Sequence, residues 1–557
     1  MTPVSLSGGV GPQARGPVST TETAGYDYVI VGGGSAGSVV ASRLAAAQPD
    51  ATVLLIEAGS DGRGVAQIVD PPQWTKLCGT ALDWGYSYRP SEHVAGRAIP
   101  VTRGKVLGGC GAINAMQWFR GHPYDYDAWE LAGATGWNYA TLLPYFRRSE
   151  DWEGGPSAHR GGAGPMRVTR PDDPHPVASA LIEGAAELGL AKLDDPNSGE
   201  TCGAALANLN IAESRRLSVV DGYLPALAPP PAPGQVPIGA WTDAPEPPLN
   251  LTVLTGSTAI RLGFGPGRRC ESVFHTVRGM LRRTRARAGV VLALGAFGTP
   301  ELLIRSCIGD PAALRALGVD IVAALPGVGR NLQDHPQLMG MNFRAKRRLG
   351  LARDNGGGAI MNWRSPRASR PDLHAFVIQG RHAYPKAAAR YGLVGAPDVF
   401  AISPGLMGST SKGRLTVRDV TKSGPDAVEI DSGFLTERRD VDALVGAMDT
   451  IMDLAATAAY ADLIDKPLMP PTRLSRAAKE AFVRENCSTS FHPCGTAAMG
   501  SGENAVVDPE LNVIGVQGLR IADASVIPVI PTGNIQAAVI AIAERAAALI
   551  TGTEAHD

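Results

Sequence analysis

Three glycines near the N-terminus and one acid downstream have the spacing of a dinucleotide-binding site. Gly32, Gly34 and Gly37 form a G-x-G-x-x-G motif, and Glu57 follows twenty residues after Gly37. Glycines allow a tight turn and a close approach of backbone to a pyrophosphate, and a following helix start offers free N–H groups. A carboxylate at the tip of the next strand can accept hydrogen bonds from ribose hydroxyls. The motif therefore predicts a dinucleotide site.

Two residues near the C-terminus have side chains suited to proton transfer and hydrogen bonding. His492 precedes a proline, which favours an extended backbone, and Asn534 immediately precedes the last helical segment, where asparagine is also a good N-cap. His-Pro dipeptides occur at four positions, 122, 175, 335 and 492, so the dipeptide alone favours a structural histidine. The isolated residues leave the catalytic and the structural interpretation open.

A second glycine-rich segment, Arg103-Gly-Lys-Val-Leu-Gly-Gly-Cys-Gly-Ala-Ile-Asn114, precedes the helix-compatible stretch 112–116. Its four glycines indicate a second place where backbone passes against a flat or anionic ligand. An ordinary glycine-rich turn is the alternative, and the segment alone favours that alternative.

Hydrophobic periodicity predicts the elements that position these motifs. A strand at 26–31, a helix at 38–47 and a strand at 51–56 surround the first glycine motif. Residues 289–295 form the continuous apolar strand typical of a parallel sheet, and a helix is expected to begin at Pro300. The remaining expected helices are 125–129, 139–146, 177–189, 440–456, 477–483 and 535–550, and the remaining strands are 251–255, 257–262, 372–379, 398–403 and 518–523.

Nucleotide-type strands near residues 28, 53, 291 and 520 flank a block, 335–480, without nucleotide signals. The predicted fold is α/β, with a discontinuous Rossmann-type domain and an inserted α+β substrate domain that contains an antiparallel sheet. A chain of 557 residues exceeds one ordinary core. The expected segments are a flexible tail (1–25), nucleotide-domain parts (26–160, 246–334, 485–557) and substrate-domain parts (161–245 with a proline-rich loop at 225–250, and 335–484).

Composition excludes several partner classes. A formal net charge of −1 gives no electrostatic basis for binding nucleic acid, and no run approaches the roughly 20 apolar residues of a membrane span. Seven cysteines form no C-x-x-C pair, and residues 1–25 lack an apolar signal core, so a cytoplasmic location is expected. Cys487, His492 and Cys494 fit no zinc spacing, so no metal site is expected.

Taken together, the motifs resemble the glucose–methanol–choline (GMC) oxidoreductases, flavoenzymes that oxidise alcohols with FAD. The segment 104–114 looks like the family's first signature, and Gly295-Ala-Phe-Gly-Thr-Pro-Glu-Leu-Leu-Ile-Arg-Ser-Cys-Ile-Gly309 looks like the second. The segment 327–335 follows as the family expects, and 492–496 and 523–534 match its C-terminal active-site region. Six motifs in the right order are more specific than any one of them.

This resemblance implies site residues position by position. His492 becomes the active-site histidine, and Asn534 the second member of a His/His or His/Asn pair. Val253 falls where the family touches adenine through its backbone, Asn114 beside the isoalloxazine, and Asp523 near the FAD phosphates and ribityl chain. The implied FAD-contacting residues are Gly32, Gly34, Ser35, Ala36, Gly37, Glu57, Ala58, Arg103, Val106, Gly108, Gly109, Asn114, Ala115, Val253, Asp523, Ala524, Asn534 and Ile535.

Two departures from the family pattern carry information. Some members attach FAD through a histidine just before the signature asparagine; here that position is Ile113, so non-covalent FAD is expected. The second signature's usual glycine is Cys307, and the usual serine run of the first is Cys110-Gly-Ala.

The implied reaction moves a hydride from an alcohol carbon to flavin N5, while His492 takes the hydroxyl proton and Asn534 bonds the same oxygen. A neutral primary alcohol, aryl or furanic, is expected because no acidic cluster suits a choline-like cation. O₂ or another acceptor would reoxidise the flavin.

Three alternatives stay open. A relative that keeps FAD but cleaves hydroxynitriles would be yellow and would not bleach with alcohol. An NAD-dependent dehydrogenase on the same fingerprint would purify colourless. A non-enzymatic flavin-binding protein is the third, although both His492 and Asn534 are present.

Overall fold

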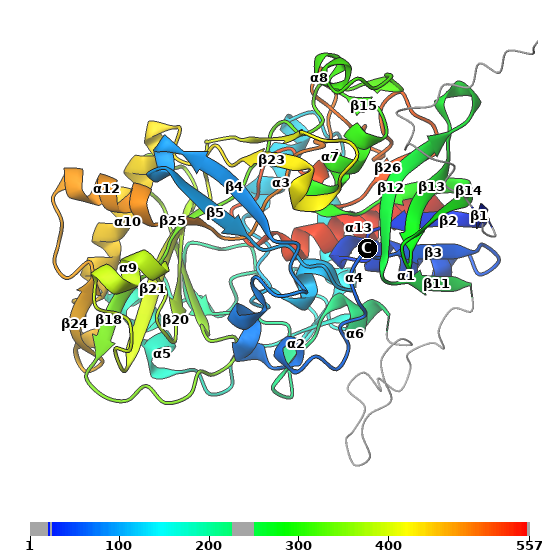
Figure 1. The fold of residues 1–557 in the computed structure, drawn as a ribbon. Coiled ribbons are helices and arrows are strands. Elements are labelled where there is room, and N and C mark those ends of the chain that lie inside the picture. Colours follow the sequence, from blue (N-terminus) through cyan, green and yellow to red (C-terminus); the bar gives the residue numbers. More distant parts are fainter. Residues whose placement is uncertain (1–20, 23–24, 225–249, 554–557) are drawn as a thin grey trace, which may run out of the picture.

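The structure is a computed structural model that describes residues 21–22, 25–224 and 250–553. Its two large β-sheets lie at opposite ends of the view in Figure 1. The nucleotide-type strands form the sheet on the right, and the strands of the inserted segments form the sheet on the left. The proline-rich segment 225–249 lies outside the described residues.

The first sheet has a parallel core. β11 (Leu251–Leu254), β3 (Val53–Ile56), β2 (Tyr26–Val31) and β14 (Met280–Leu292) follow one another, and β26 (Leu519–Ile521) also pairs with β14. All four residues of β3 are buried, as a parallel sheet covered on both faces requires. The predicted grouping of strands near 28, 53, 291 and 520 is confirmed.

β14 is longer than the expected strand at 289–295. Its first half joins β13 (Cys270–Val277), which pairs with β12 (Ser257–Phe264), in an antiparallel extension. Exposed arginines alternate with buried residues in this half, so no continuous apolar run marks it. The apolar run covers only the part of the strand that is buried in the parallel core.

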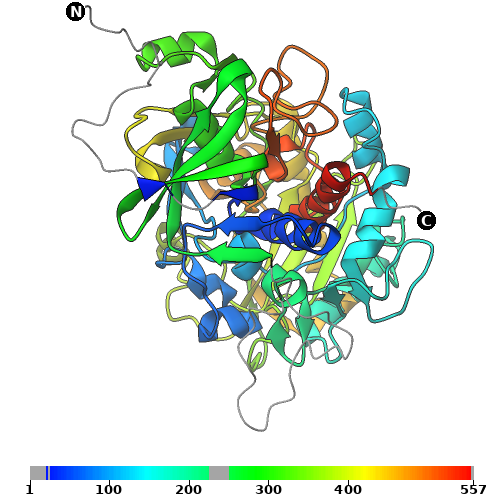
Figure 2. The same ribbon diagram turned by 90° about the vertical axis from the view of Figure 1, so that its right-hand side faces the viewer.

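Two helices cover this sheet near the expected nucleotide site. α1 (Ser35–Ala47) begins three residues earlier than expected, so Gly37 lies in its first turn. α13 (Ile535–Thr551) packs against α1 and also against α4 (Tyr139–Ser149), and Figure 2 shows α13 beside α1. α13 is apolar and buried around nearly its whole circumference, which identifies it as a core helix.

α7 (Gly295–Arg305) corrects the expected helix start, because Pro300 lies inside the helix. A proline there leaves the carbonyl of Ala296, four residues earlier, without its helical donor. The hydroxyl of Thr496 donates to that carbonyl at 2.6 Å. A tertiary contact thus replaces the missing bond, which the local sequence does not indicate.

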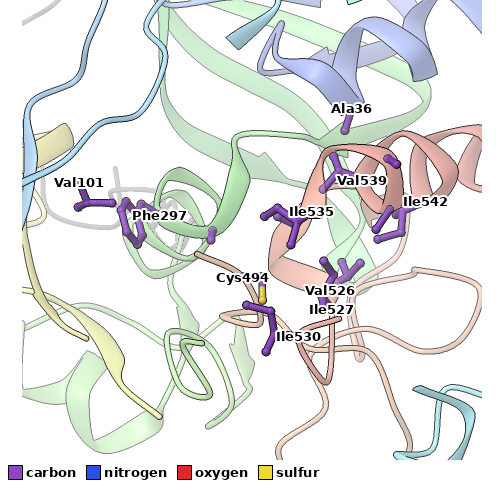
Figure 3. Close-up of a cluster of buried hydrophobic side chains, with 14 of the residues drawn as sticks. Ala36, Val101, Phe297, Cys494, Val526, Ile527, Ile530, Ile535, Val539 and Ile542 are labelled. Atoms are coloured by element: carbon purple, nitrogen blue, oxygen red, sulfur yellow. The ribbon is translucent and has the colours of Figure 1, made fainter. Parts of the chain in front are cut away.

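A cluster of buried side chains joins α7 and α13 to the C-terminal loops. Phe297 of α7 lies on one side, and Ile535 and Val539 of α13 lie on the other, with Cys494 and Ile530 below them (Figure 3). These side chains are 0–8% exposed. The close packing fixes the position of the helix start that carries Asn534.

The second sheet is antiparallel, as predicted. Its strand order is β24 (Ile464–Met469), β18 (Met341–Ala345), β21 (Val399–Leu406), β20 (Leu373–Ile378), β19 (Ala359–Trp363) and β8 (Gly203–Leu206). α10 (Arg438–Leu454) packs on β21, and α5 (Pro176–Glu187) packs on β8 and β19. β17 (Pro336–Leu338) pairs with β21 and with β25 (Cys487–Thr489). β25 therefore joins this sheet although it lies in the segment 485–557.

Smaller elements complete the chain. The stretch 112–116 is not a helix; a short 3₁₀ turn, Gly109–Ala112, precedes it. Within the expected tail, β1 (Thr21–Glu22) pairs with β14. The helices not yet named are α2 (Ala66–Val69), α3 (Pro123–Leu131), α6 (Val219–Tyr223), α8 (Pro311–Ala316), α9 (Pro385–Arg390), α11 (Ala458–Ala461) and α12 (Arg476–Asn486). The remaining longer strands are β4 (Tyr86–Ser91), β5 (Arg97–Val101), β22 (Arg414–Val417) and β23 (Val428–Asp431).

Cys307 occupies a backbone position where glycine is the natural choice. Its φ is +66°, in the left-handed region, directly after α7. Side chains other than glycine are uncommon in that region, which explains why a family signature would place glycine there. Cys307 therefore holds a backbone conformation that is strained for cysteine and unstrained for glycine.

Within the described ranges, no helix is both long and apolar enough to cross a membrane.

Candidate active site

A cavity of about 500 Å³ lies between the two sheets. Most of the predicted site residues line it. They are Gly32, Gly34, Ser35, Ala36, Glu57, Ala58, Arg103, Gly109, Asn114, Ala115, His492, Asp523, Ala524, Asn534 and Ile535. Residues that are separated by up to about 500 positions in the chain thus line one cavity.

Four predicted residues do not line the cavity, and each has a visible packing role. A Cβ on Gly37 would lie 1.8 Å from the carbonyl oxygen of Gly32, so no side chain fits between α1 and the turn. Gly108 donates its N–H to the Gly33 carbonyl at 2.7 Å. Val106 is fully buried in a small apolar cluster, and Val253 pairs with Leu55 in the sheet.

The two glycine-rich segments touch each other at one end of the cavity. A Cβ on Gly109, whose φ is +55°, would lie 2.7 Å from the Cα of Gly34. A Cβ on Gly34 would meet only Gly109, at 3.8 Å. The expectation that backbone passes twice against one ligand site is consistent with this contact, and the free face of Gly34 leaves room for a flat or anionic group.

The start of α1 fits a pyrophosphate. Its N-cap is Gly34, no side chain caps its first N–H groups, and no acid lies in its first turn. Unpaired N–H groups and the positive end of the helix dipole favour an anion there. The start of α13 also faces the cavity, and Gln536 in its first turn bonds the Ser35 hydroxyl at 3.0 Å.

Glu57 stabilises the glycine turn by accepting backbone N–H groups. Its carboxylate accepts the N–H of Gly33 at 2.9 Å and the N–H of Gly59 at 2.7 Å. Burial raises the pKa of Glu57 to about 7 against the lowering effect of these bonds. Glu57 therefore shapes the turn in addition to lining the expected ribose position.

Asp523 has its carboxylate oxygens engaged by the protein. They accept the N–H of Gly295 at 2.9 Å, the hydroxyl of Thr299 at 2.6 Å and the N–H of Ser525 at 2.7 Å. Burial raises its pKa. Asp523 thus ties the start of α7 to the end of β26, at the edge of the cavity.

Arg103 and Asn114 connect the second glycine segment to the active-site loops. A guanidinium nitrogen of Arg103 donates to the carbonyl of Phe491 at 2.5 Å. The Asn114 side-chain oxygen accepts the N–H of Met116 and a nitrogen of Arg216, both at 2.9 Å. Arg216 is buried and was not found from the sequence, because no motif marks it.

Pairing of β17 with β25 places two histidine loops side by side. In this antiparallel register Pro336 lies opposite Thr489, and the loops continue with a backbone bond from Ser490 to the His335 carbonyl at 2.9 Å. Phe491 adopts a left-handed φ of +64° just before His492. Such strain costs about 1–3 kcal/mol and persists only where neighbours enforce it.

His492, Asn534 and His335 meet at the cavity wall. Nε2 of His492 lies 3.2 Å from Nδ2 of Asn534, and Nδ1 of His492 lies 2.9 Å from Nδ1 of His335. Asn534 occupies the N-cap position of α13, yet its side chain makes no capping bond. The side chain is directed to the histidine instead.

The environment keeps His492 neutral. Burial away from bulk water lowers its pKa well below the ordinary value, and His335, Arg103 and His374 lower it further. Its ring faces the cavity, so it is partly accessible although far from bulk solvent. A neutral imidazole has one nitrogen with a lone pair that can accept a proton.

The wall opposite the glycine segments, here called the substrate side, comes from the second sheet and was largely missed by sequence reasoning. It consists of Gln337, Met339, His374, Phe376, His382, Tyr384, Met407, Ser490, Phe491 and His492. Burial lowers the pKa of both His374 and His382 to about 4. These residues lack a shared motif, because five separate segments contribute one to three residues each.

The four His-Pro dipeptides divide into two pairs. His122 and His175 are N-cap residues of α3 and α5, which is the structural role favoured for any one of them. His335 and His492 form the contact in the active site. Because 157 residues separate His335 from His492, the sequence does not indicate that they meet.

Among the residues that the structure places, no group of three or more histidine, cysteine or acidic side chains gathers as metal ligands would.

A glycine-lined dinucleotide site that opens onto a neutral histidine–amide pair defines a class, the nucleotide-dependent oxidoreductases. Family models described as GMC oxidoreductase match residues 26–229 and 240–337 and residues 409–543. The chain belongs to the GMC oxidoreductase family, and it is an FAD-dependent enzyme acting on CH–OH groups.

Two relatives match nearly the whole chain. An oxygen-dependent choline dehydrogenase of Brucella melitensis is 32% identical over 94% of this chain and 95% of its own. The mitochondrial choline dehydrogenase of Homo sapiens is 32% identical over 95% of this chain and 90% of its own.

Solved structures also match nearly the whole chain. Pyridoxine 4-oxidase from "Mesorbium loti" matches with a TM-score of 0.85 and 32% identity, covering 94% of this chain and 98% of the other. A formate oxidase matches with a TM-score of 0.82 and 25% identity over 96% and 99%. The expected fold class, family and cofactor are confirmed.

Proposed function

We propose that this chain oxidises a neutral primary alcohol, aryl or heteroaryl, to the aldehyde, with His492 as the general base. The observation that carries the proposal is the neutral His492 beside Asn534 on the wall of the cavity. The bound flavin accepts the hydride from the alcohol carbon.

His492 and Asn534 have complementary tasks toward one oxygen. A substrate hydroxyl that replaces the direct contact between Asn534 and His492 can give its proton to Nε2 of His492 while it accepts an N–H from Asn534. General-base help contributes about 10²–10⁴ in rate, and a fixed orientation of the C–H adds to it. Because His492 is neutral before the reaction, no proton must first leave it.

FAD contacts are proposed for the glycine side of the cavity, with the α1 start holding the pyrophosphate. Gly32, Gly34, Glu57, Asn114 and Asp523 line that side. Ile113 also lines the cavity and carries no nucleophile, which supports non-covalent binding. The cytoplasmic location and the domain boundaries stay predictions.

The charge of the lining supports a neutral substrate. The carboxylates that line the cavity are Glu57, Glu301 and Asp523, all on nucleotide-domain elements. The substrate side carries aromatic rings, neutral histidines, amide, hydroxyl and thioether groups. An aromatic alcohol that forms hydrogen bonds suits this wall better than a quaternary ammonium, and pyridoxine 4-oxidase is named for a substrate of that kind.

The test is anaerobic titration of the purified protein with a panel that includes benzyl, furfuryl and pyridylmethyl alcohols, pyridoxine and choline. The proposal expects the yellow flavin band to bleach with a neutral aryl or heteroaryl alcohol. Admission of air then distinguishes O₂ from another acceptor as oxidant.

Two results would contradict the proposal. Bleaching by choline alone would overturn the substrate class, and a yellow protein that no member of the panel bleaches would favour the redox-silent relative. Product analysis for the aldehyde completes the assay, since bleaching without aldehyde would also refute it.

A further inference from the structure

The contact between His335 and His492 has a chemical consequence beyond packing. The two Nδ1 atoms lie 2.9 Å apart, and the rings stand at 82° to each other. His335 is 0% exposed. Two neutral imidazoles that approach in this way share one proton, so one Nδ1 donates and the other accepts.

The surroundings of His335 keep its ring neutral. Burial and, to a smaller extent, His374 lower the pKa of His335 to about 3, and the carbonyls of Pro531 and Met407 only partly oppose this shift. Its Nε2 is buried and has no hydrogen-bond partner among the described residues. Carbonyls only accept, so their presence is consistent with an N–H on this ring. The donor across the Nδ1–Nδ1 contact is decided by the groups on the other side of His492.

The contact on the other side of His492 assigns the tautomer. Nδ2 of Asn534, 3.2 Å from Nε2 of His492, can only donate. The lone pair of His492 must therefore lie on Nε2, which faces the cavity. The proton of His492 then lies on Nδ1 and is donated to Nδ1 of His335, whose own proton lies on Nε2.

Asp334 does not take the role that a carboxylate plays in many histidine sites. One of its oxygens accepts the N–H of His335 at 2.7 Å and the N–H of His492 at 2.9 Å. Its other oxygen accepts the Tyr88 hydroxyl at 2.6 Å and the Thr489 hydroxyl. Asp334 holds the two backbones together, and among the described residues the neutral ring of His335 is the hydrogen-bond partner of Nδ1 of His492.

We propose that His335 is a positioning residue that fixes His492 in the tautomer with the proton on Nδ1 and the lone pair on Nε2. The partner of a ring nitrogen selects the tautomer of the other nitrogen. Because this partner is neutral, it orients His492 without adding the negative charge that would make the base easier to protonate.

The ionisable groups around the pair are few. Arg103 and His374 face His492, His374 also acts on His335, and Asp334 lies behind both backbones. A carboxylate placed at position 335 would add the first negative side chain in contact with the His492 ring. The pH dependence of the base is therefore sensitive to this one position.

The role of His335 builds on the proposed function, but the primary test is independent of activity. Histidines labelled with ¹⁵N in the FAD-bound protein are observed by NMR, and the signals of His335 and His492 are identified by their loss in variants. The wild-type protein is expected to show His492 protonated on Nδ1 and His335 protonated on Nε2. A proton on Nε2 of His492 would overturn the inference whether or not any alcohol is oxidised.

Variants at position 335 separate positioning from packing. His335→Asn keeps an acceptor oxygen near the place of Nδ1 and should reduce alcohol-dependent flavin reduction by less than about tenfold, whereas His335→Leu should reduce it by about 10²-fold or more and mix the His492 tautomers. His335→Asp should move the acidic limb of the pH–rate profile upward by about one unit or more.

His175→Asn is the matched control, since His175 is an equally buried histidine at the start of α5, where asparagine can also cap. Its rate and the His492 signals should stay unchanged. Equal losses in His335→Asn and His335→Leu, with an unchanged pH limb in His335→Asp, would show that His335 only fills space and would overturn the inference.

Discussion

Buried carboxylates line the glycine side of the cavity, whereas buried histidines line the substrate side. Burial raises the pKa of Glu57 and of Glu301 to about 7, and backbone N–H groups bond both carboxylates. Burial lowers the pKa of His374 and His382 to about 4. Desolvation acts on both sides and favours the neutral form of each group.

The difference reflects what each side has to hold. In the proposed function, the glycine side binds the anionic cofactor through backbone N–H groups and helix starts, so its geometry depends on the absence of side chains. The substrate side is proposed to take up a proton, so it depends on side chains held in one protonation state. Changes of backbone should therefore affect the first side, and changes of side-chain chemistry the second.

The largest effect is expected on the glycine side. Gly37→Ala should abolish FAD binding and lower the free energy of unfolding by about 1–3 kcal/mol or more, because its Cβ would overlap the Gly32 carbonyl. FAD content and thermal unfolding measure this. Gly446→Ala in α10 is the control: nothing lies within 4 Å of its Cβ, and a gain of about 0.5–1 kcal/mol is expected. A Gly37→Ala protein with full FAD would contradict the comparison.

The second-largest effect is expected from a change on the substrate side. His492→Ala should retain FAD and reduce the rate constant of flavin reduction by alcohol by about 10²–10⁴-fold, since the base is lost while the glycine turns are untouched. Stopped-flow absorbance under anaerobic conditions measures it. His122→Asn, which keeps an N-cap on α3, should behave as wild type. Unchanged reduction in His492→Ala would refute the base assignment.

Asn534→Ala tests whether an amide at a helix start serves the reaction or the helix. The rate constant of flavin reduction should fall by about tenfold to a hundredfold, the value of one lost hydrogen bond in a buried site. The melting temperature should change little, because the Asn534 side chain makes no capping bond. A normal rate together with a lower melting temperature would reduce Asn534 to a helix cap.

The smallest effect is expected from pH. A base must be neutral to act, and the pKa of His492 is lowered well below its usual value, so it is already neutral throughout the neutral range. The rate constant of flavin reduction should stay flat from about pH 8 down to about pH 6.5, the ordinary pKa of histidine, and fall only below it. Stopped-flow measurements across this range check the direction of the pH dependence. A fall in rate centred at or above pH 6.5 would contradict the lowered pKa of His492.

The sequence by itself determined the nucleotide side. The strand at 26–31, Gly32 to Gly37 and Glu57 are close in the chain, and the turn they form follows from local backbone chemistry. The buried parallel strands are also visible as apolar runs. The family resemblance added the positions of His492 and Asn534 and implied that both act on one substrate oxygen.

The tertiary structure alone decided the rest. His335 meets His492 across 157 residues because β17 and β25 pair in one register that the backbone bond from Ser490 to the His335 carbonyl continues, and a shift of that register would move the two loops apart. Pro300 sits inside α7 because Thr496, 200 residues beyond Ala296, supplies the missing donor. The substrate side gathers single residues from separate strands, and such a wall leaves no pattern in the sequence because its spacing is set by the sheet and not by the chain.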